Sequence, residues 1–132
     1  DEEIKRRINI AKSTFTKMNK VLTSKKIDME TRKRICQCYV WSTLLYGVET
    51  WTITDTMRER ISAFEMWTYR RMLRISWKEK IRNEEVLKMI NNQERIMKKI
   101  GSKKLKYFGH IIRHDSLHPS ILDGKVDGKT NF

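Results

Sequence analysis

Apolar side chains recur at every third or fourth position from residue 4 to residue 22. They are Ile4, Ile8, Ala11, Phe15, Met18 and Leu22. Successive residues of an α-helix are rotated by about 100°, so these side chains share one face. Lys5, Lys12 and Lys20 fall outside that face. The pattern predicts an amphipathic helix with a basic outer face.

The next helix is predicted over residues 29–47. Asp28 is a suitable N-cap, and Glu30 lies in the first turn, where a carboxylate suits the helix dipole. From residue 35 to residue 48 apolar side chains surround the helix axis. Because a helix that is apolar on all sides is a buried one, we expect this helix at the centre of the fold, with Gly47 near its end.

Three further helices are predicted in the rest of the chain. Their expected ranges are residues 54–76, 83–90 and 93–114. The first and the last of them combine a broad apolar face with a basic face. Trp67 is expected to project among the arginines of the first, which are Arg60, Arg70, Arg71 and Arg74.

Together these segments predict an all-α fold, a bundle of about four to five helices around the buried helix at residues 29–47. The chain has only five glycines and one proline, which is typical of long uninterrupted helices. The helical domain is expected to span residues 1–114. Residues 115–132 contain Pro119 and the turn-forming sequence DGKVDGK, and we expect an irregular C-terminal tail there.

The chain is strongly basic, with 29 Lys and Arg against 16 Asp and Glu and a formal net charge of +13. Residues 1–27, 55–82 and 83–114 each hold eight basic and three or four acidic side chains, whereas residues 28–54 hold three of each. Cationic helix faces neutralise phosphates and release counterions, so they favour nucleic-acid binding. The alternative is that they only keep the domain soluble.

We expect the basic faces of several helices to assemble into one continuous surface for a polyanion. The predicted phosphate contacts are Lys5, Lys12, Lys20, Arg70, Arg71, Arg74, Lys98, Lys99 and Lys103. Trp67 is the candidate for stacking on a base or sugar. The alternative for Trp67 is docking against another protein segment.

No pattern in the sequence predicts an active site. The carboxylates are scattered rather than paired as two-metal phosphoryl chemistry requires, and the glycines form no phosphate loop. His110, His114 and His118 have the spacing of metal ligands on a helix, but Pro119 disfavours a helix at His118. We expect no catalytic residue, metal site, cofactor or small-molecule substrate in this chain.

The two cysteines, Cys36 and Cys38, would point in nearly opposite directions on a helix and could form neither a disulfide nor a zinc site. This favours a reduced, intracellular protein. No run of about 18 apolar residues is present, so no membrane span is expected. The chain begins at Asp1 without an initiator Met or a secretory signal, as expected of a piece of a longer protein.

Five short blocks along the chain carry a family resemblance. They are residues 44–52 (LLYGVETWT), 63–66 leading into 69–77 (AFEM and YRRMLRISW), 82–87 (RNEEVL), 105–113 (LKYFGHIIR) and 124–129 (GKVDGK). The first resembles the LLYG-ETW block that follows the palm in reverse transcriptases of LINE-type, or non-LTR, retrotransposons. The other blocks agree with that family in the same order, so the resemblance covers nearly the whole chain.

The resemblance implies that the chain is the thumb, with the start of the C-terminal region, of an endonuclease–reverse transcriptase. In that family the thumb is a helical bundle that grips the template–primer duplex. The endonuclease and the polymerase carboxylates with their Mg²⁺ lie upstream of it. The implied role is noncatalytic: holding an RNA–DNA or DNA duplex beside the palm of the same polyprotein during RNA-directed DNA synthesis, in the nucleus or the cytoplasm.

Two alternatives stay open. Family members commonly continue after the Gly-Lys tail into an Arg/Gly-rich stretch, whereas this chain stops at residues 130–132 (TNF). A decayed retroelement fragment without activity is therefore one alternative. The other is a helical protein–protein interaction module, in which Trp67 and its arginines dock on an acidic partner or on the palm.

Overall fold

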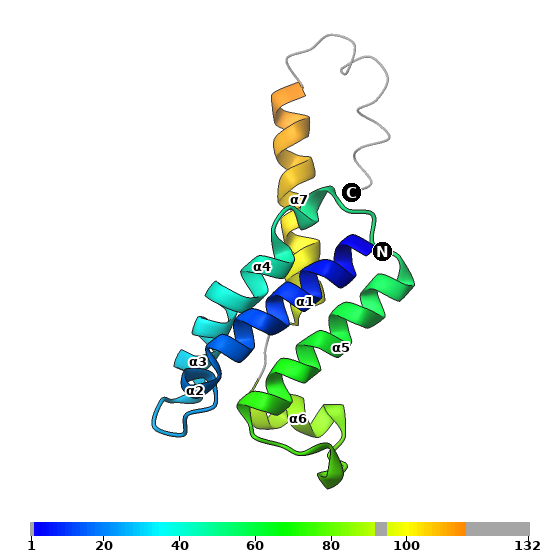
Figure 1. Ribbon diagram of the computed structural model, residues 1–132. Coiled ribbons are helices and arrows are strands. Elements are labelled where there is room, and N and C mark those ends of the chain that lie inside the picture. The colour runs from blue at the N-terminus through cyan, green and yellow to red at the C-terminus, as the bar shows by residue number, and fades with distance from the viewer. Residues whose placement is uncertain (1, 92–94, 116–132) are drawn as a thin grey trace.

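The computed structural model describes residues 2–91 and 95–115, and within these ranges it is helical and contains no strand. The elements are α1 (Glu2–Lys17), α2 (Asn19–Leu22), α3 (Met29–Ile35), the π-helix η1 (Cys36–Trp41), α4 (Ser42–Leu45), the 3-10 turn η2 (Val48–Thr50), α5 (Asp55–Met72), the 3-10 turn η3 (Trp77–Glu79), α6 (Asn83–Ile90) and α7 (Ile96–Asp115). α1 leads into α2, and α3, η1 and α4 form one rod, so the described helices make five rods (Figure 1).

The predicted all-α bundle is confirmed. Residues 116–132 of the predicted tail, and the predicted start of the last helix at Gln93, lie outside the described residues.

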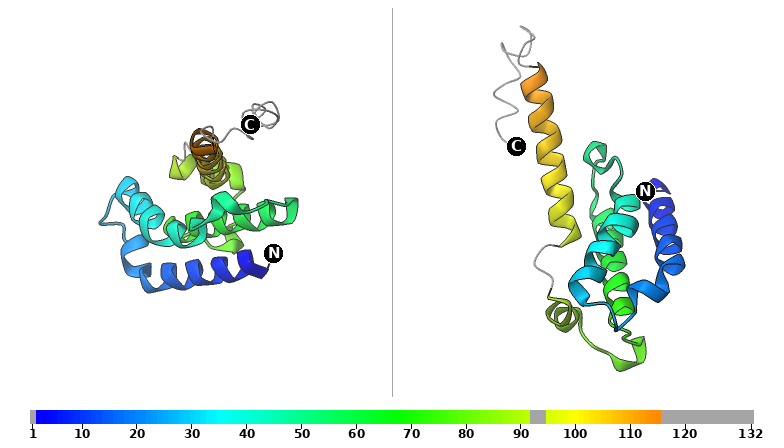
Figure 2. Two further views of the ribbon diagram at one scale, coloured as in Figure 1. Left: turned by 90° about the horizontal axis from the view of Figure 1, so that it is seen from above. Right: turned by 90° about the vertical axis from the view of Figure 1, so that its left-hand side faces the viewer.

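The rods are arranged in three layers. α1 lies on one side of a middle layer that is made by the α3–η1–α4 rod and α5, and α7 lies on the other side (Figure 2). α6 packs against α5 at one end of the bundle (Figure 1). The C-terminal half of α7 extends beyond the other helices (Figures 1 and 2).

The predicted apolar face of α1 is the face that meets the middle layer. Its side chains Ile4, Ile8, Ala11 and Phe15 are buried. The middle layer contributes the largest buried side chains, among them Trp41, Phe64 and Tyr69. Burying one such side chain stabilises the fold by ~2 kcal/mol, so this core holds the layers together.

The rod at residues 29–45 is central, but one side of it is exposed rather than buried as predicted. Trp41 and Val40 are buried, whereas Cys38, Tyr39 and Tyr46 are exposed. The reason is that α1, α5 and α7 surround the rod incompletely, and no described helix covers its remaining side (Figure 1).

The predicted N-cap Asp28 is confirmed, but one predicted helix end is wrong. The Asp28 carboxylate accepts the Thr31 N–H (3.1 Å), and the Thr54 hydroxyl accepts the Met57 N–H (3.2 Å). α5, in contrast, ends at Met72 rather than near Ser76.

The end of α5 is set by a left-handed residue, Arg74, whose φ is 57°. The chain turns there, and the Ile75 N–H donates to the carbonyl of Arg70 (2.9 Å). Glycine usually occupies such a position, and an arginine gives no comparable signal in the sequence.

A fully buried carboxylate ties α7 to α5. Glu65 accepts hydrogen bonds from the Tyr69 hydroxyl (3.0 Å), the Arg95 guanidinium (2.8 Å) and the Ile96 N–H (3.1 Å). Because Ile96 is the first residue of α7, the carboxylate also lies at the favourable end of the helix dipole. Burial, and secondarily the Glu65 charge, raise the pKa of Tyr69 well above its ordinary value. These contacts fix the place where α7 begins.

The two cysteines are free, and they are expected to differ sharply in reactivity. Burial raises the pKa of the Cys36 thiol to about 12, whereas Cys38 is exposed. Since the thiolate is the nucleophile, iodoacetamide at pH 8 should label Cys38 quickly and Cys36 only after unfolding. Mass spectrometry with and without urea checks this, and the C38S variant should lose the fast reaction. Equal labelling rates of the two native thiols would contradict the packing around Cys36.

Candidate nucleic-acid interface

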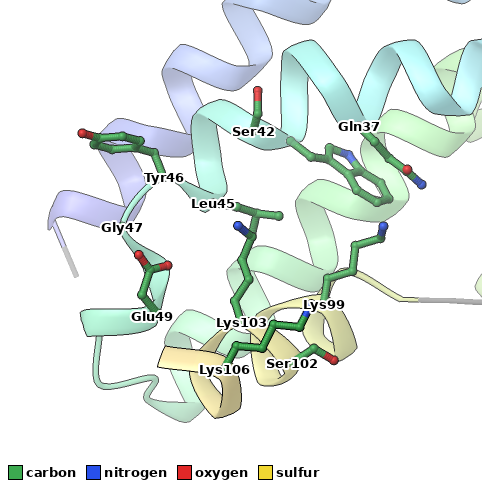
Figure 3. Close-up of a pocket in the computed structure, with 11 residues that line it drawn as sticks. Gln37, Ser42, Leu45, Tyr46, Gly47, Glu49, Lys99, Ser102, Lys103 and Lys106 are labelled. Atoms are coloured by element: carbon green, nitrogen blue, oxygen red, sulfur yellow. The ribbon is translucent and has the colours of Figure 1, made fainter. Parts of the chain in front are cut away.

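A groove of about 780 Å³ lies between α7 and the α3–η1–α4 rod (Figure 3). Its lining residues are Gln37, Trp41, Ser42, Leu45, Tyr46, Gly47, Glu49, Lys99, Ser102, Lys103 and Lys106. One wall is a face of α7. The other wall comes from η1, α4 and the turn that follows α4.

Three lysines dominate the α7 wall. Lys99, Lys103 and Lys106 are spaced i, i+4 and i+7, so they project from one face of the helix. Ile96 and Ile100, on another face of α7, are buried in the core. Burial of these isoleucines sets the rotation of α7 and turns the lysine row toward the groove.

The opposite wall offers polar and aliphatic groups to the lysine row. Lys99 extends across the groove toward Gln37, and Lys103 extends toward Leu45 (Figure 3). Tyr46, at the mouth, is 74% exposed. The wall therefore presents an amide and aliphatic surface to the three ammonium groups, whereas the Tyr46 ring points away from them, with the Arg7 guanidinium 5.2 Å from its centroid (Figure 3).

The π-helix η1 shapes this wall. A π-helix places more residues in each turn than an α-helix, and such segments recur at functional sites. Gln37 and Trp41 of η1, with Ser42 just after it, all line the groove. Trp41 is almost completely buried, and its indole N–H has no hydrogen-bond partner within the described structure.

The groove lysines carry charge that the described chain leaves uncompensated. In the ranges 2–91 and 95–115, Lys99, Lys103 and Lys106 form no ion pair. Among the described residues, Glu49 is the one carboxylate that lines the groove, and the sequence of residues 96–113 contains no Asp or Glu. Phosphate groups would therefore meet little competition for these ammonium groups.

The basic residues near the start of α1 are compensated instead. The predicted contact Lys5 pairs with Glu2 (3.5 Å), and Glu3 pairs with Arg6 (2.7 Å) and Arg7 (2.9 Å). Hydrogen bonds from these two arginines hold the pKa of Glu3 below its ordinary value. This end of α1 is a weaker anion site than its lysine and arginine content indicates.

Trp67 does not stand free on the surface. Its ring packs against Phe64 (centroids 6.0 Å apart, interplanar angle 17°) and edge-on against Phe15 (5.2 Å). The Arg71 guanidinium lies 4.6 Å and the Lys12 ammonium 5.3 Å from its centroid. The structure thus brings three predicted site residues together, but as a cation–π cluster between α1 and α5.

Two of the other predicted arginines bind backbone carbonyls of their own chain. Arg70 donates to the Ile81 carbonyl (2.7 Å) and to the Asn83 side chain (2.8 Å), and Arg74 donates to the Thr23 carbonyl (2.9 Å). Lys20 is exposed beside Arg74, in a hollow of about 480 Å³ that Lys25 and Lys26 also line.

The predicted residues do not form one continuous surface. α1 and α7 lie on opposite sides of the middle layer (Figure 2), so their cations face different ways. Lys99 and Lys103 line the groove, and Lys98 is exposed next to them on α7. The residues that belong to the other side or to the end of the bundle are Lys5, Lys12, Lys20, Trp67, Arg70, Arg71 and Arg74.

The sequence analysis missed Lys106, Tyr46 and the exposed Trp77 as candidates. Lys106 continues the spacing of Lys99 and Lys103, so helical periodicity alone could have found it. Tyr46 and Trp77 follow helix ends, and their exposure depends on tertiary packing that no local pattern reveals.

No group of three metal-ligating side chains occurs among the described residues. His118, the last of the three histidines whose spacing resembles that of metal ligands on a helix, lies outside them. The helices that the structure describes include none with the length and apolar character that crossing a membrane requires.

No family model, curated protein or solved structure matches the chain at a significant level.

Proposed function

We propose that this chain is a noncatalytic nucleic-acid-binding module that holds the phosphate backbone of a template–primer duplex in the α7 groove. The observation that carries the proposal is the row Lys99, Lys103 and Lys106, which has no ion pair in the described structure. The row spans ~10 Å along the helix. That length equals the rise of about three nucleotides of one strand along the duplex axis.

The resemblance to the thumb of LINE-type reverse transcriptases supports the same proposal. Two of its blocks meet at the groove: residues 44–52 supply Leu45 and Tyr46 to one wall, and residues 105–113 supply Lys106 to the other. In this role the chain would grip an RNA–DNA or DNA duplex beside an upstream palm, and the palm would carry the catalytic carboxylates and Mg²⁺.

Lysine ammonium groups bind phosphates as point charges and do not read base edges, so binding should be independent of sequence and steeply dependent on salt. Replacing Lys99, Lys103 and Lys106 by Gln should lower the slope of log affinity against log salt by about 2–3 units, since each lost phosphate contact removes ~0.9. Fluorescence anisotropy with a labelled RNA–DNA duplex between 50 and 200 mM salt measures this slope.

A matched variant controls for total charge. Lys17, Lys25 and Lys88 are exposed lysines outside the groove, and their replacement by Gln gives the same net charge as the groove variant. This control should keep a slope close to that of the unmodified chain. An equal loss of slope in both variants would show that overall charge, not the groove, binds the duplex.

A protein-interaction module is the second candidate, and two exposed aromatic rings favour it: Tyr39 of the middle rod and Tyr46 just after the rod. Competition separates the two functions. If unlabelled duplex fails to displace labelled duplex, the interaction module is preferred. If the chain is instead a decayed fragment without activity, we expect neither cooperative thermal unfolding nor salt-dependent binding of the duplex.

A further inference from the structure

Trp77 has the largest exposed fraction, 79%, of the exposed large hydrophobic side chains in the described part of the chain. It lies on η3, the turn that connects α5 with α6 and projects from the end of the bundle (Figure 1). An indole in this position adds little to the core and is free to contact a partner, as tryptophan often does at interfaces.

Several hydrogen bonds stabilise the turn that carries Trp77. The Glu79 carboxylate accepts the Ser76 N–H (2.7 Å), and the Ser76 hydroxyl accepts the Lys78 N–H (3.3 Å), which together form a capping box. At its base, the Arg70 guanidinium donates to the Ile81 carbonyl (2.7 Å). These bonds fix the backbone of the turn from which the indole projects.

Two residues, one on each side of the turn, have left-handed backbone conformations. They are Arg74 (φ 57°) and Lys80 (φ 54°). Residues other than glycine adopt this region only at an energetic cost. The fold therefore accepts both backbone strain and an exposed indole at the same place.

The charges around Trp77 define the partner that would cover it. Residues 74–82 include three exposed cations, Lys78, Lys80 and Arg82, besides Arg74, which is exposed but donates to the Thr23 carbonyl. Glu79 is the one acid in this range, and its carboxylate is engaged in the capping box. An apolar ring among cations complements a partner with flat rings and negative charge, as a nucleobase between phosphates has.

We propose that Trp77 stacks on an unpaired or terminal base while the surrounding cations bind the adjacent phosphates. The inference rests on the proposed function and narrows its substrate to nucleic acid with an open end or a single-stranded stretch. In a continuous duplex, neighbouring bases already cover both faces of each base. A membrane surface fits less well, because interfacial binding needs a wider apolar face than one ring.

Two DNA probes with equal numbers of phosphates test the proposal: a dumbbell duplex whose two ends are closed by non-nucleotide linkers, so that it has no unpaired base, and a duplex with a single-stranded overhang. The unmodified chain should prefer the overhang probe. W77A should lose about tenfold in affinity for the overhang probe and none for the dumbbell, and W77F should keep most of the preference. Y39A, which removes a 59% exposed aromatic ring elsewhere, should leave both affinities unchanged.

Equal weakening of both probes by W77A, or no change in either, would overturn the stacking role. Cosedimentation with phosphatidylcholine–phosphatidylserine vesicles tests the membrane alternative. Loss of vesicle binding in W77A with unchanged overhang affinity would also overturn stacking. The proposed function fails separately, if the groove lysine variant binds the dumbbell as tightly and with the same salt slope as the unmodified chain.

Discussion

Replacing Glu65 by Ala is expected to lower the free energy of unfolding by about 3 kcal/mol. The substitution leaves the Tyr69 hydroxyl and the Ile96 N–H without their buried acceptor, and each such loss costs about 1–3 kcal/mol. The Arg95 contact adds less, because the Arg95 side chain is 41% exposed and partly screened by solvent. Urea denaturation followed by circular dichroism measures the change.

The same substitution should loosen α7 specifically. Hydrogen exchange of the Ile96 amide should accelerate more than exchange in α1, since the Glu65 carboxylate is the acceptor of that N–H. E65Q keeps a side-chain oxygen and should be less destabilising than E65A. The control is E59A, an exposed acid on the same helix, which should change stability by no more than about 0.5 kcal/mol. Equal effects of E59A and E65A would refute the anchoring role.

The second large effect on the free energy of unfolding is expected from replacing Trp41. The ring is buried and lies 5.7 Å from the Tyr69 ring, so W41A should leave a cavity and cost about 4 kcal/mol. W41F should be nearly neutral, within about 1 kcal/mol, because removing the unpartnered N–H relieves a desolvation penalty that offsets the lost contacts.

The exposed Trp77 provides the matched control for Trp41, since W77A removes the same side chain from a solvated position. Thermal and urea unfolding should be unchanged by W77A and strongly shifted by W41A. A W41F variant that loses as much stability as W41A would mean that the indole N–H has a partner in solution.

The helices and most of their inner faces could be predicted from the sequence because both depend on local patterns. The spacing of Ile4, Ile8 and Phe15 predicted the buried face of α1, and the side-chain chemistry of Asp28 predicted the cap of α3. These signals need no knowledge of the neighbouring helices.

The candidate site was only partly predictable, because it depends on which helices become neighbours. A helical wheel places Trp67 among cations but cannot show that Phe15 and Phe64 cover the ring. It identifies a basic face on α1 and another on α7, but their relative orientation is set by the layer between them. Glu65 was missed for a similar reason, since its three donors lie on two helices and a loop.

The position of α1 and α7 on opposite sides of the middle layer has a consequence for how the molecule tolerates a net charge of +13. Two interhelical spacings of 8–10 Å put their axes roughly 16–20 Å apart. That separation exceeds the Debye length of ~8 Å at physiological ionic strength, so mutual repulsion of the two cation sets is largely screened. Added salt should therefore change the melting temperature little, while it steeply weakens the grip on a polyanion.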